Sequence, residues 1–345
     1  MKQKYQNDIP DNYSMESLRQ EMSAYQMPTR IKSIWQIANT FIPYFLLCGG
    51  IYYVMQYSFW VSLPLILLAA GFLVRIFIIF HDCTHGSFFQ SHRANNFWGK
   101  VTGVLTFTPF YSWKSSHVRH HGTSGNLDKR GHGDVWTMTV AEYKSAPLKM
   151  RLRYRLYRNP AVMFLLGPIY IFLVSNRFPG KNAPKKERIS VYGTDAAILI
   201  MAGLLSLFFG LKTYIIIQFL ILYAALIGGV WLFYVQHQFE DVYWADNEDW
   251  NFVDASLRGA SFYKLPPFLS WFTGNIGYHH IHHLNPGIPN YNLPKCQKGI
   301  PVFRRVEPIG LISSLKSIEY RLWDEQSLRL VGFRSIKSYD NEPHS

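Results

Sequence analysis

Cysteine is scarce in this chain of 345 residues, which contains only three. Cys48, Cys83 and Cys296 form no CxxC pair and no disulfide pattern. This excludes a disulfide-stabilised secreted scaffold and fits a reducing compartment. Internal repeats and low-complexity tracts are also missing from the sequence. We therefore expect one domain rather than a series of modules.

Charged residues are absent from Ser33 to Val74, although the whole chain carries a formal net charge of +13. A helix needs roughly 20 apolar residues to cross a bilayer, so this run predicts two spans with a turn near Gln56–Ser58. The uncharged runs Ala196–Leu211 and Thr213–Phe239 predict two more. The predicted fold class is all-α and integral to the membrane. It has four transmembrane helices, at about 34–56, 59–80, 195–211 and 213–236.

Two shorter uncharged runs, Val101–Trp113 and Asn159–Asn176, have basic residues on both sides. Pro160, Gly167 and Pro168 also interrupt the second run. Because basic segments tend to stay in the cytoplasm, a single crossing by either run would break that pattern. We interpret both as interfacial or re-entrant segments. The alternative is that both cross the membrane, which gives six spans.

The basic residues assign sides to the spans. All lysines and arginines except Arg75 and Lys212 lie outside the four predicted helices and the turns that join them. We therefore expect a cytoplasmic N-terminal segment at 1–32 and one domain at 33–345, with a cytoplasmic cap made of 81–194 and 237–345. The turns near residues 57 and 212 are then external. The protein is expected to be a multi-pass protein of the cell membrane.

Histidine is plentiful and patterned. Residues three and four apart share a helix face, and three groups have that spacing: HDCTH at 81–85, HVRHH at 117–121 and HHIHH at 279–283. One more histidine ends the fourth apolar run. All lie at the cytoplasmic ends of spans or in basic segments, so they can meet in one layer. The predicted metal ligands are His81, His85, His117, His120, His121, His237, His279, His282 and His283.

Nine imidazoles are too many for one tetrahedral zinc but enough for two octahedral-type redox metals. Neutral donors leave the positive charge of the metals uncompensated. Reduced iron tolerates such an environment and binds dioxygen, and the oxidised species can remove hydrogen from an unactivated C–H bond. Such bonds are present in the neighbouring lipid. We expect no catalytic residue beyond the metal ligands, with dioxygen as co-substrate.

Metal-bound histidines usually donate their second N–H to an acceptor, so carboxylates near the groups are candidates for an orienting role. The alternative for these carboxylates is an ordinary salt bridge with a nearby Arg or Lys. His280 points off the face of its neighbours and is interpreted as an orienting or structural residue. His92, His132 and His344 stand alone and are interpreted as surface or core residues. The orienting candidates are Asp82, Asp128, Asp134 and His280.

Two other classes of protein compete with the oxidative reading. HDCTH is similar to the HExxH zinc-protease motif, but aspartate is shorter than glutamate and that motif needs only one further ligand. A metal transporter would hold its site near the bilayer midplane rather than in a cap. A non-catalytic metal carrier stays open as the alternative outside enzymes.

The order HxxxH, HxxHH, HxxHH in a membrane context resembles the membrane fatty acid desaturases. Further stretches resemble the bacterial acyl-lipid members of that family. These are GFLVRIFIIFHDCTHGSFF, NLDKRGHGDVW, YRNPAVMFLLGPIYIF, WLFYVQHQFEDVYW and GNIGYHHIHHLNPGIPNYNL. The resemblance runs from near Thr40 through Arg334. It matches the three histidine groups to the family's three boxes, and His237 to the family's isolated ninth ligand.

The resemblance implies two irons and a cis double bond placed in acyl chains of membrane phospholipids, with Δ5 the first expectation and Δ12 or another position next. It also implies that Asn275, four residues before His279, holds a metal-bound water. Electrons would come singly from ferredoxin or flavodoxin, which are acidic and would be steered by the basic loops. Anionic headgroups could attract the same loops, and no nucleic-acid partner is expected. Within enzymes, a histidine-box hydroxylase or ketolase is the alternative.

Overall fold

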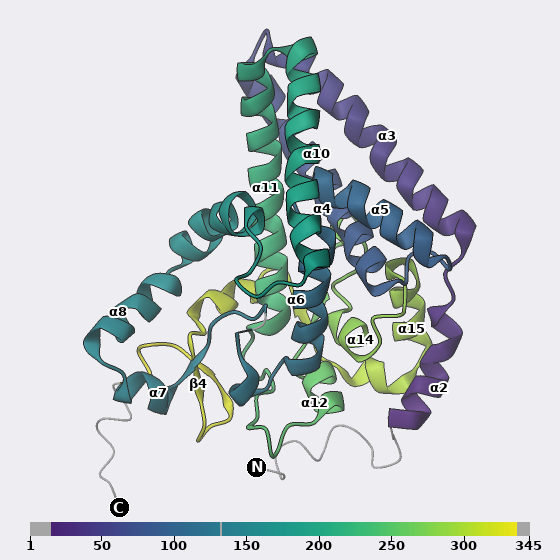
Figure 1. The fold of residues 1–345 in the computed structure, drawn as a ribbon. Helices are drawn as coiled ribbons and strands as arrows, with labels where there is room; N and C mark the ends of the chain where they lie inside the picture. The colour runs from purple at the N-terminus through teal and green to yellow at the C-terminus, as the bar shows by residue number, and fades with distance from the viewer. Residues whose placement is uncertain (1–14, 132, 337–345) are drawn as a thin grey trace, which may run out of the picture.

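The computed structural model describes residues 15–131 and 133–336, so His132 and His344 lie outside the described residues (Figure 1). Helices dominate. The shorter elements are α2 (Met15–Gln26), α5 (His92–Leu105), α6 (Phe110–Thr123), η1 (Leu127–Lys129), β1 (Met138–Thr139), α7 (Val140–Ser145), α8 (Leu148–Tyr157), η2 (Val162–Leu166), α9 (Gly167–Ile169), η3 (Tyr170–Val174), η4 (Ser175–Arg177), α12 (Phe252–Leu257), β2 (Phe262–Lys264), α13 (Pro267–Phe272), α14 (His279–Leu284), η5 (Asn290–Asn292), α15 (Leu293–Gly299), η6 (Pro301–Arg305), β3 (Pro308–Gly310), η7 (Ser313–Glu319), β4 (Leu322–Asp324) and β5 (Arg329–Val331).

Four described helices are long and apolar enough to cross a membrane: α3 (Arg30–Met55), α4 (Phe59–His85), α10 (Lys185–Phe209) and α11 (Leu211–His237). The predicted all-α fold with four spans is confirmed. The helices differ from the predicted spans at their ends, because backbone hydrogen bonding continues past the last apolar residue. Thus α4 runs on through the first histidine group, and α10 begins among basic residues.

The long helices rise together toward one end of the molecule, and the short elements form a broad base at the other end (Figure 1). Helix α4 packs against α3, α5 and α11. In its most apolar stretch 56% of the residues are buried, compared with 11% in α10. The core of the bundle therefore lies around α4, while most of the apolar surface of α10 is left to face lipid.

The two ambiguous runs do not form straight helices. Val101–Trp113 is divided between α5 and α6, with Pro109 directly before α6. Asn159–Asn176 is covered by η2, α9, η3 and part of η4, and the segment Val162–Arg177 is bent by 62° from α8. The described residues thus offer four candidate spans, or five if the bent pair counts as one. The described residues do not offer six candidate spans, because the first run is broken before it reaches spanning length.

Small strand pairings hold the base together. β4 lies between β1, which runs parallel to it, and β5, which is antiparallel. β2 pairs in parallel with β3. The Tyr263 N–H, in β2, donates to the carbonyl of Gly277 just before α14. The start of the third histidine group is therefore fixed by backbone pairing as well as by side-chain packing.

We predict that the turn between α10 and α11 lies across the membrane from the base. Reporter fusions after Leu127 and Lys186 should report the same side, and a fusion at Lys212 the opposite side, because α10 and α11 each cross once. If Lys186 reports the side opposite Leu127, the bent segment Val162–Arg177 crosses the membrane and the four-span arrangement is contradicted.

Candidate metal centre

The nine predicted ligands come from four helices. His81 and His85 end α4, and His237 is the last residue of α11. Helix α4 stops at Gly86, whose φ of 75° is left-handed and is readily adopted by glycine, so the chain turns directly after the ligand. Helices α6 and α14 carry the other two groups. The four helices therefore bring their histidines together in one layer.

The structure brings the ligands together in two sets that divide the sequence groups. Both sets take rings from α6 and from α14. In each of these helices the two histidines that lie four residues apart face one set, and the remaining histidine faces the other set. His279 joins the second set, since its Nε2 lies 3.0 Å from that of His237. The first set is His81, His85, His117, His121 and His282, and its candidate ligand atoms lie within 4.8 Å of one another. The second set also holds His120, His237 and His283, and the ligand atoms of these three lie within 4.8 Å of one another.

Neighbouring ring nitrogens are spaced as ligands of one ion. Successive Nε2 atoms are separated by 2.9 Å from His81 to His117, and by 3.1 Å from His120 to His237. Two nitrogens about 2.1 Å from one ion lie about 3 Å apart at a right angle and about 3.4 Å apart in a tetrahedron. Both spacings are compatible with two nitrogens that bind one ion, and the five rings of the first set exceed the four ligands of tetrahedral zinc.

Two contacts orient rings of the second set. His120 Nδ1 lies 2.7 Å from the Asp134 carboxylate, and His237 Nδ1 lies 3.1 Å from the carbonyl of Gly259. Both partners only accept, so each Nδ1 carries a proton and the two Nε2 atoms face each other at 3.1 Å in a buried site. Two imidazole nitrogens placed in this way are positioned to bind one ion.

Two further observations fit metal binding. The Nε2 atoms of His85 and His283 are buried without a hydrogen-bond partner among the described residues. Burial lowers the pKa of His121, His279 and His282 well below the usual value, and repulsion between neighbouring imidazoles lowers each pKa further. The rings are therefore kept neutral, as metal coordination requires.

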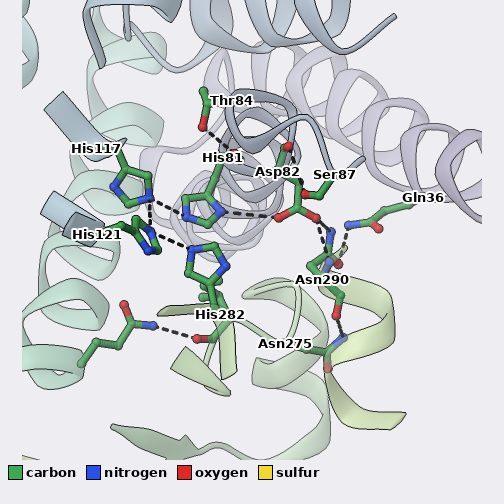
Figure 2. A network of polar contacts seen from close by, with 12 residues as sticks. Gln36, His81, Asp82, Thr84, Ser87, His117, His121, Asn275, His282 and Asn290 are labelled. Carbon is green, nitrogen blue, oxygen red and sulfur yellow. Dashed lines mark hydrogen bonds and ion pairs between the residues drawn. The ribbon is translucent and has the colours of Figure 1, made fainter. Parts of the chain in front are cut away.

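Figure 2 shows the contacts that support the first histidine group through Asp82. Asp82 Oδ1 lies 3.4 Å from His81 Nδ1, while its Oδ2 accepts from the backbone N–H and the side-chain amide of Asn290, both at 2.8 Å. Gln36 donates to Asn290 Oδ1 at 3.1 Å. The Asn275 amide donates to the Asn290 carbonyl at 3.5 Å. The carboxylate is thus held by α3 and η5 while it faces the ligand.

The predicted orienting residues have different positions. Asp82 and Asp134 contact ligand rings. Asp128 does not orient a ring in the described structure: it is exposed and accepts from the Asn247 N–H at 2.8 Å, which ties two loops together. His280 is fully buried, and its Nε2 contacts Gln297 at 3.0 Å, so it connects α14 to α15. Burial lowers the pKa of His280 to about 4.

Asn275 contacts the network behind Asp82, and no contact between Asn275 and a ligand ring is seen in the described structure. Sequence reasoning missed three supporting groups: Asn290, Gln36 and the Gly259 carbonyl. Asn290 lies within the NPGIPNYNL stretch that carried the family resemblance, which is the one available signal. Nothing in the spacing of the histidines points to Gln36 or Gly259.

Comparison with known proteins agrees with this geometry. The family model described as fatty acid desaturase matches residues 58–305, which include all nine ligands. The chain belongs to the fatty acid desaturase family. It is 49% identical to a fatty acid desaturase of Bacillus subtilis (strain 168), over 94% of this chain and 92% of that protein. This desaturase is an oxidoreductase, and the resemblance stated from its sequence is confirmed.

More distant relatives name lipid substrates. An sn-1 acyl-lipid omega-3 desaturase (ferredoxin) of Synechocystis is 27% identical over 74% of this chain and 72% of that protein. An sn-1 oleoyl-lipid 12-desaturase of Picosynechococcus is 26% identical over 73% of this chain and 72% of that protein. This desaturase therefore has relatives that differ in the position of the double bond.

Loss of a ligand should remove metal. In the variant His237→Ala the second set loses the ring that contacts both His120 and His279, so we expect at least one metal ion fewer per chain and no unsaturated product. His92→Ala removes an exposed histidine outside both sets and should retain metal and activity. Metal content by mass spectrometry, with fatty acid analysis of a host, measures both. Equal metal content in the two variants would contradict this assignment.

The two aspartates provide a matched pair. Asp134→Asn removes the charge that accepts from His120 Nδ1, and we expect metal affinity to fall by about 10- to 100-fold. Asp128→Asn makes the same chemical change at an exposed loop and should leave affinity unchanged. Competition with a chelator of known affinity measures the difference. An equal loss in both variants would show that Asp134 does not act through His120.

Proposed function

We propose that this desaturase places a cis double bond at Δ5 in acyl chains already esterified in membrane phospholipids. Two irons held by the nine histidines would serve the reaction, with dioxygen as co-substrate. The observation that carries the proposal is the gathering of nine imidazoles into two sets, next to the ends of two span-capable helices, α4 and α11. The acyl-lipid substrates named for the relatives support the lipid substrate.

Irons bound in the two sets would supply the oxidising power, drawn from dioxygen, to remove two hydrogens from neighbouring methylenes. The residues of this chain hold and orient the rings. Asp134 and Gly259 keep the protons of His120 and His237 on Nδ1, so that each Nε2 faces the centre. Burial of the layer excludes bulk water, which would otherwise compete for the oxidant.

An aromatic wall lies between the first ligand set and the bundle. The ring of Trp113 stacks on His117 with 4.1 Å between centroids, and Phe77 lies against Trp113 at 5.6 Å. Phe172 of η3 lies against Phe77 at 6.5 Å. These side chains offer an apolar surface to an acyl chain beside the ligands. Because the headgroup stays at the membrane surface, such a surface would count carbons from the carboxyl end, as Δ5 placement requires.

The ligand layer would face the cytoplasm, in the cell membrane, since the base carries nearly all the basic residues. Ferredoxin or flavodoxin would then supply the electrons. The name of the Synechocystis relative includes ferredoxin. The positive charge of the base would also attract an acidic electron carrier. Placement at position 12 is the second candidate, favoured by the relatives that act there.

Substrate form and position can be tested in one experiment. Cells expressing the protein receive a pulse of labelled saturated fatty acid, and new lipid synthesis is then blocked. We expect unsaturation to continue in pre-existing phospholipid, with the double bond at Δ5 after derivatisation and mass spectrometry. Double bonds that appear only in thioesters before incorporation would contradict the lipid substrate. A different position in phospholipid would contradict Δ5 alone.

A further inference from the structure

Helix α8 presents two opposite apolar faces. Tyr154 is fully buried and packs its ring against Trp136. Leu148, Leu152 and Leu156 are exposed by 64%, 57% and 63%. Residues four apart lie on one helix face, so the three leucines form a stripe. Each residue advances about 100°, which places Leu152 about 200° from Tyr154. The stripe therefore points away from the protein.

Cations border the leucine stripe on both sides. Counted at about 100° per residue, Lys149 and Arg153 lie along one edge, and Arg151 and Arg155 lie along the other. Helix α8 contains no acidic residue. An apolar stripe between two rows of Lys and Arg is the pattern of a helix that lies in the plane of a membrane surface. The long side chains can keep their charged ends at the phosphates while their stems lie on apolar surface.

The position of α8 suits this role. It slants from the base toward the long helices (Figure 1). Beyond a 62° bend the chain continues as Val162–Arg177, and there Phe164 packs on Trp231 and Tyr234 of α11. The apolar segment after the bend is thus fixed to a span, while α8 leaves it at an angle at the level of the base.

Helix α8 is also tied to the ligand layer. Arg158, the residue after it, is 1% exposed and donates to Gln238 Oε1 at 2.8 Å. Gln238 directly follows the ligand His237. The segment beyond the bend carries Phe172, which belongs to the aromatic wall beside the first ligand set. The C-terminal end of α8 is thus linked to the end of α11 that carries His237.

We propose that α8 lies in the plane of the membrane surface and binds the headgroups of anionic phospholipids. Its leucines enter the acyl-chain region, and its cations contact the lipid phosphates. The inference rests on the membrane location given under the proposed function. A lipid surface is favoured over a protein partner because cations border the exposed leucines on both sides and match anionic headgroups. Arg155 also contacts the protein, since its Nε donates to the Tyr143 hydroxyl at 2.6 Å.

Spin labels can locate the stripe. Single cysteines are placed at Leu152, at Leu207 and at Lys298 of the full chain in nanodiscs containing phosphatidylglycerol. Leu207 is 82% exposed on α10 and serves as the lipid-facing control, while Lys298 is an exposed residue of α15 and serves as the aqueous control. We expect the label at 152 to be more accessible to oxygen than to a nickel chelate, as at 207.

Each outcome has a definite meaning. If the label at 152 is as accessible to the nickel chelate as the label at 298, while the label at 207 is in lipid, the proposal is overturned and the membrane location stands. If the label at 207 is also aqueous, the membrane location itself fails. Dipolar coupling between labels at 152 in two chains would show that a second copy covers the stripe, which also overturns the proposal.

A charge test separates lipid binding from simple burial. Quenching of a fluorophore at 152 by brominated phosphatidylglycerol is compared with quenching by brominated phosphatidylcholine. Lys149→Gln with Arg153→Gln should lower the preference for the anionic lipid roughly 30-fold, since each cation near such a surface contributes about fivefold. Lys295→Gln with Lys298→Gln makes the same charge change on α15 and should leave the preference intact. An unchanged preference in the α8 variant overturns the proposal.

Discussion

The structure depends on bringing imidazole rings from four helices into one layer. Asp134 and the Gly259 carbonyl accept from the Nδ1–H of His120 and His237, so the two Nε2 atoms face each other at 3.1 Å. A metal ion between them would join the rings. Its binding would also stabilise the packing of the base, because a site that forms only on folding couples the free energy of binding to that of folding.

This constraint explains how the helices are arranged. Helices α4 and α11 must end in the same layer. Helices α6 and α14 must each carry histidines on two faces, one for each ligand set. The short pairing of β2 with β3 and the fully buried His280 serve this purpose, since both fix α14. The long apolar helices can anchor the chain in a membrane, and the predicted ligands at the ends of α4 and α11 would give the site access to lipid.

Much of this could be predicted from the sequence. The absence of charge predicted the four span-capable helices, and helical spacing predicted the histidines that the structure brings together, because both signals are local along the chain. The division of the ligands into two sets is not local, since it depends on how α6 and α14 face each other. Asn290 contacts Asp82 across 208 residues of sequence and Gln36 across 254, beyond the reach of any spacing rule. Asp128 was placed beside the ligands because it is near them in sequence, yet the chain turns it outward to Asn247.

X-ray absorption at the iron edge of the purified protein tests the central claim most directly. The account predicts nitrogen or oxygen neighbours at about 2.1 Å, with outer-shell scattering from several imidazoles and no sulfur. Cys83 is buried beside the ligands yet stands outside both sets, so it should contribute nothing. A sulfur shell at about 2.3 Å, or zinc in place of iron, would contradict two all-histidine iron sites.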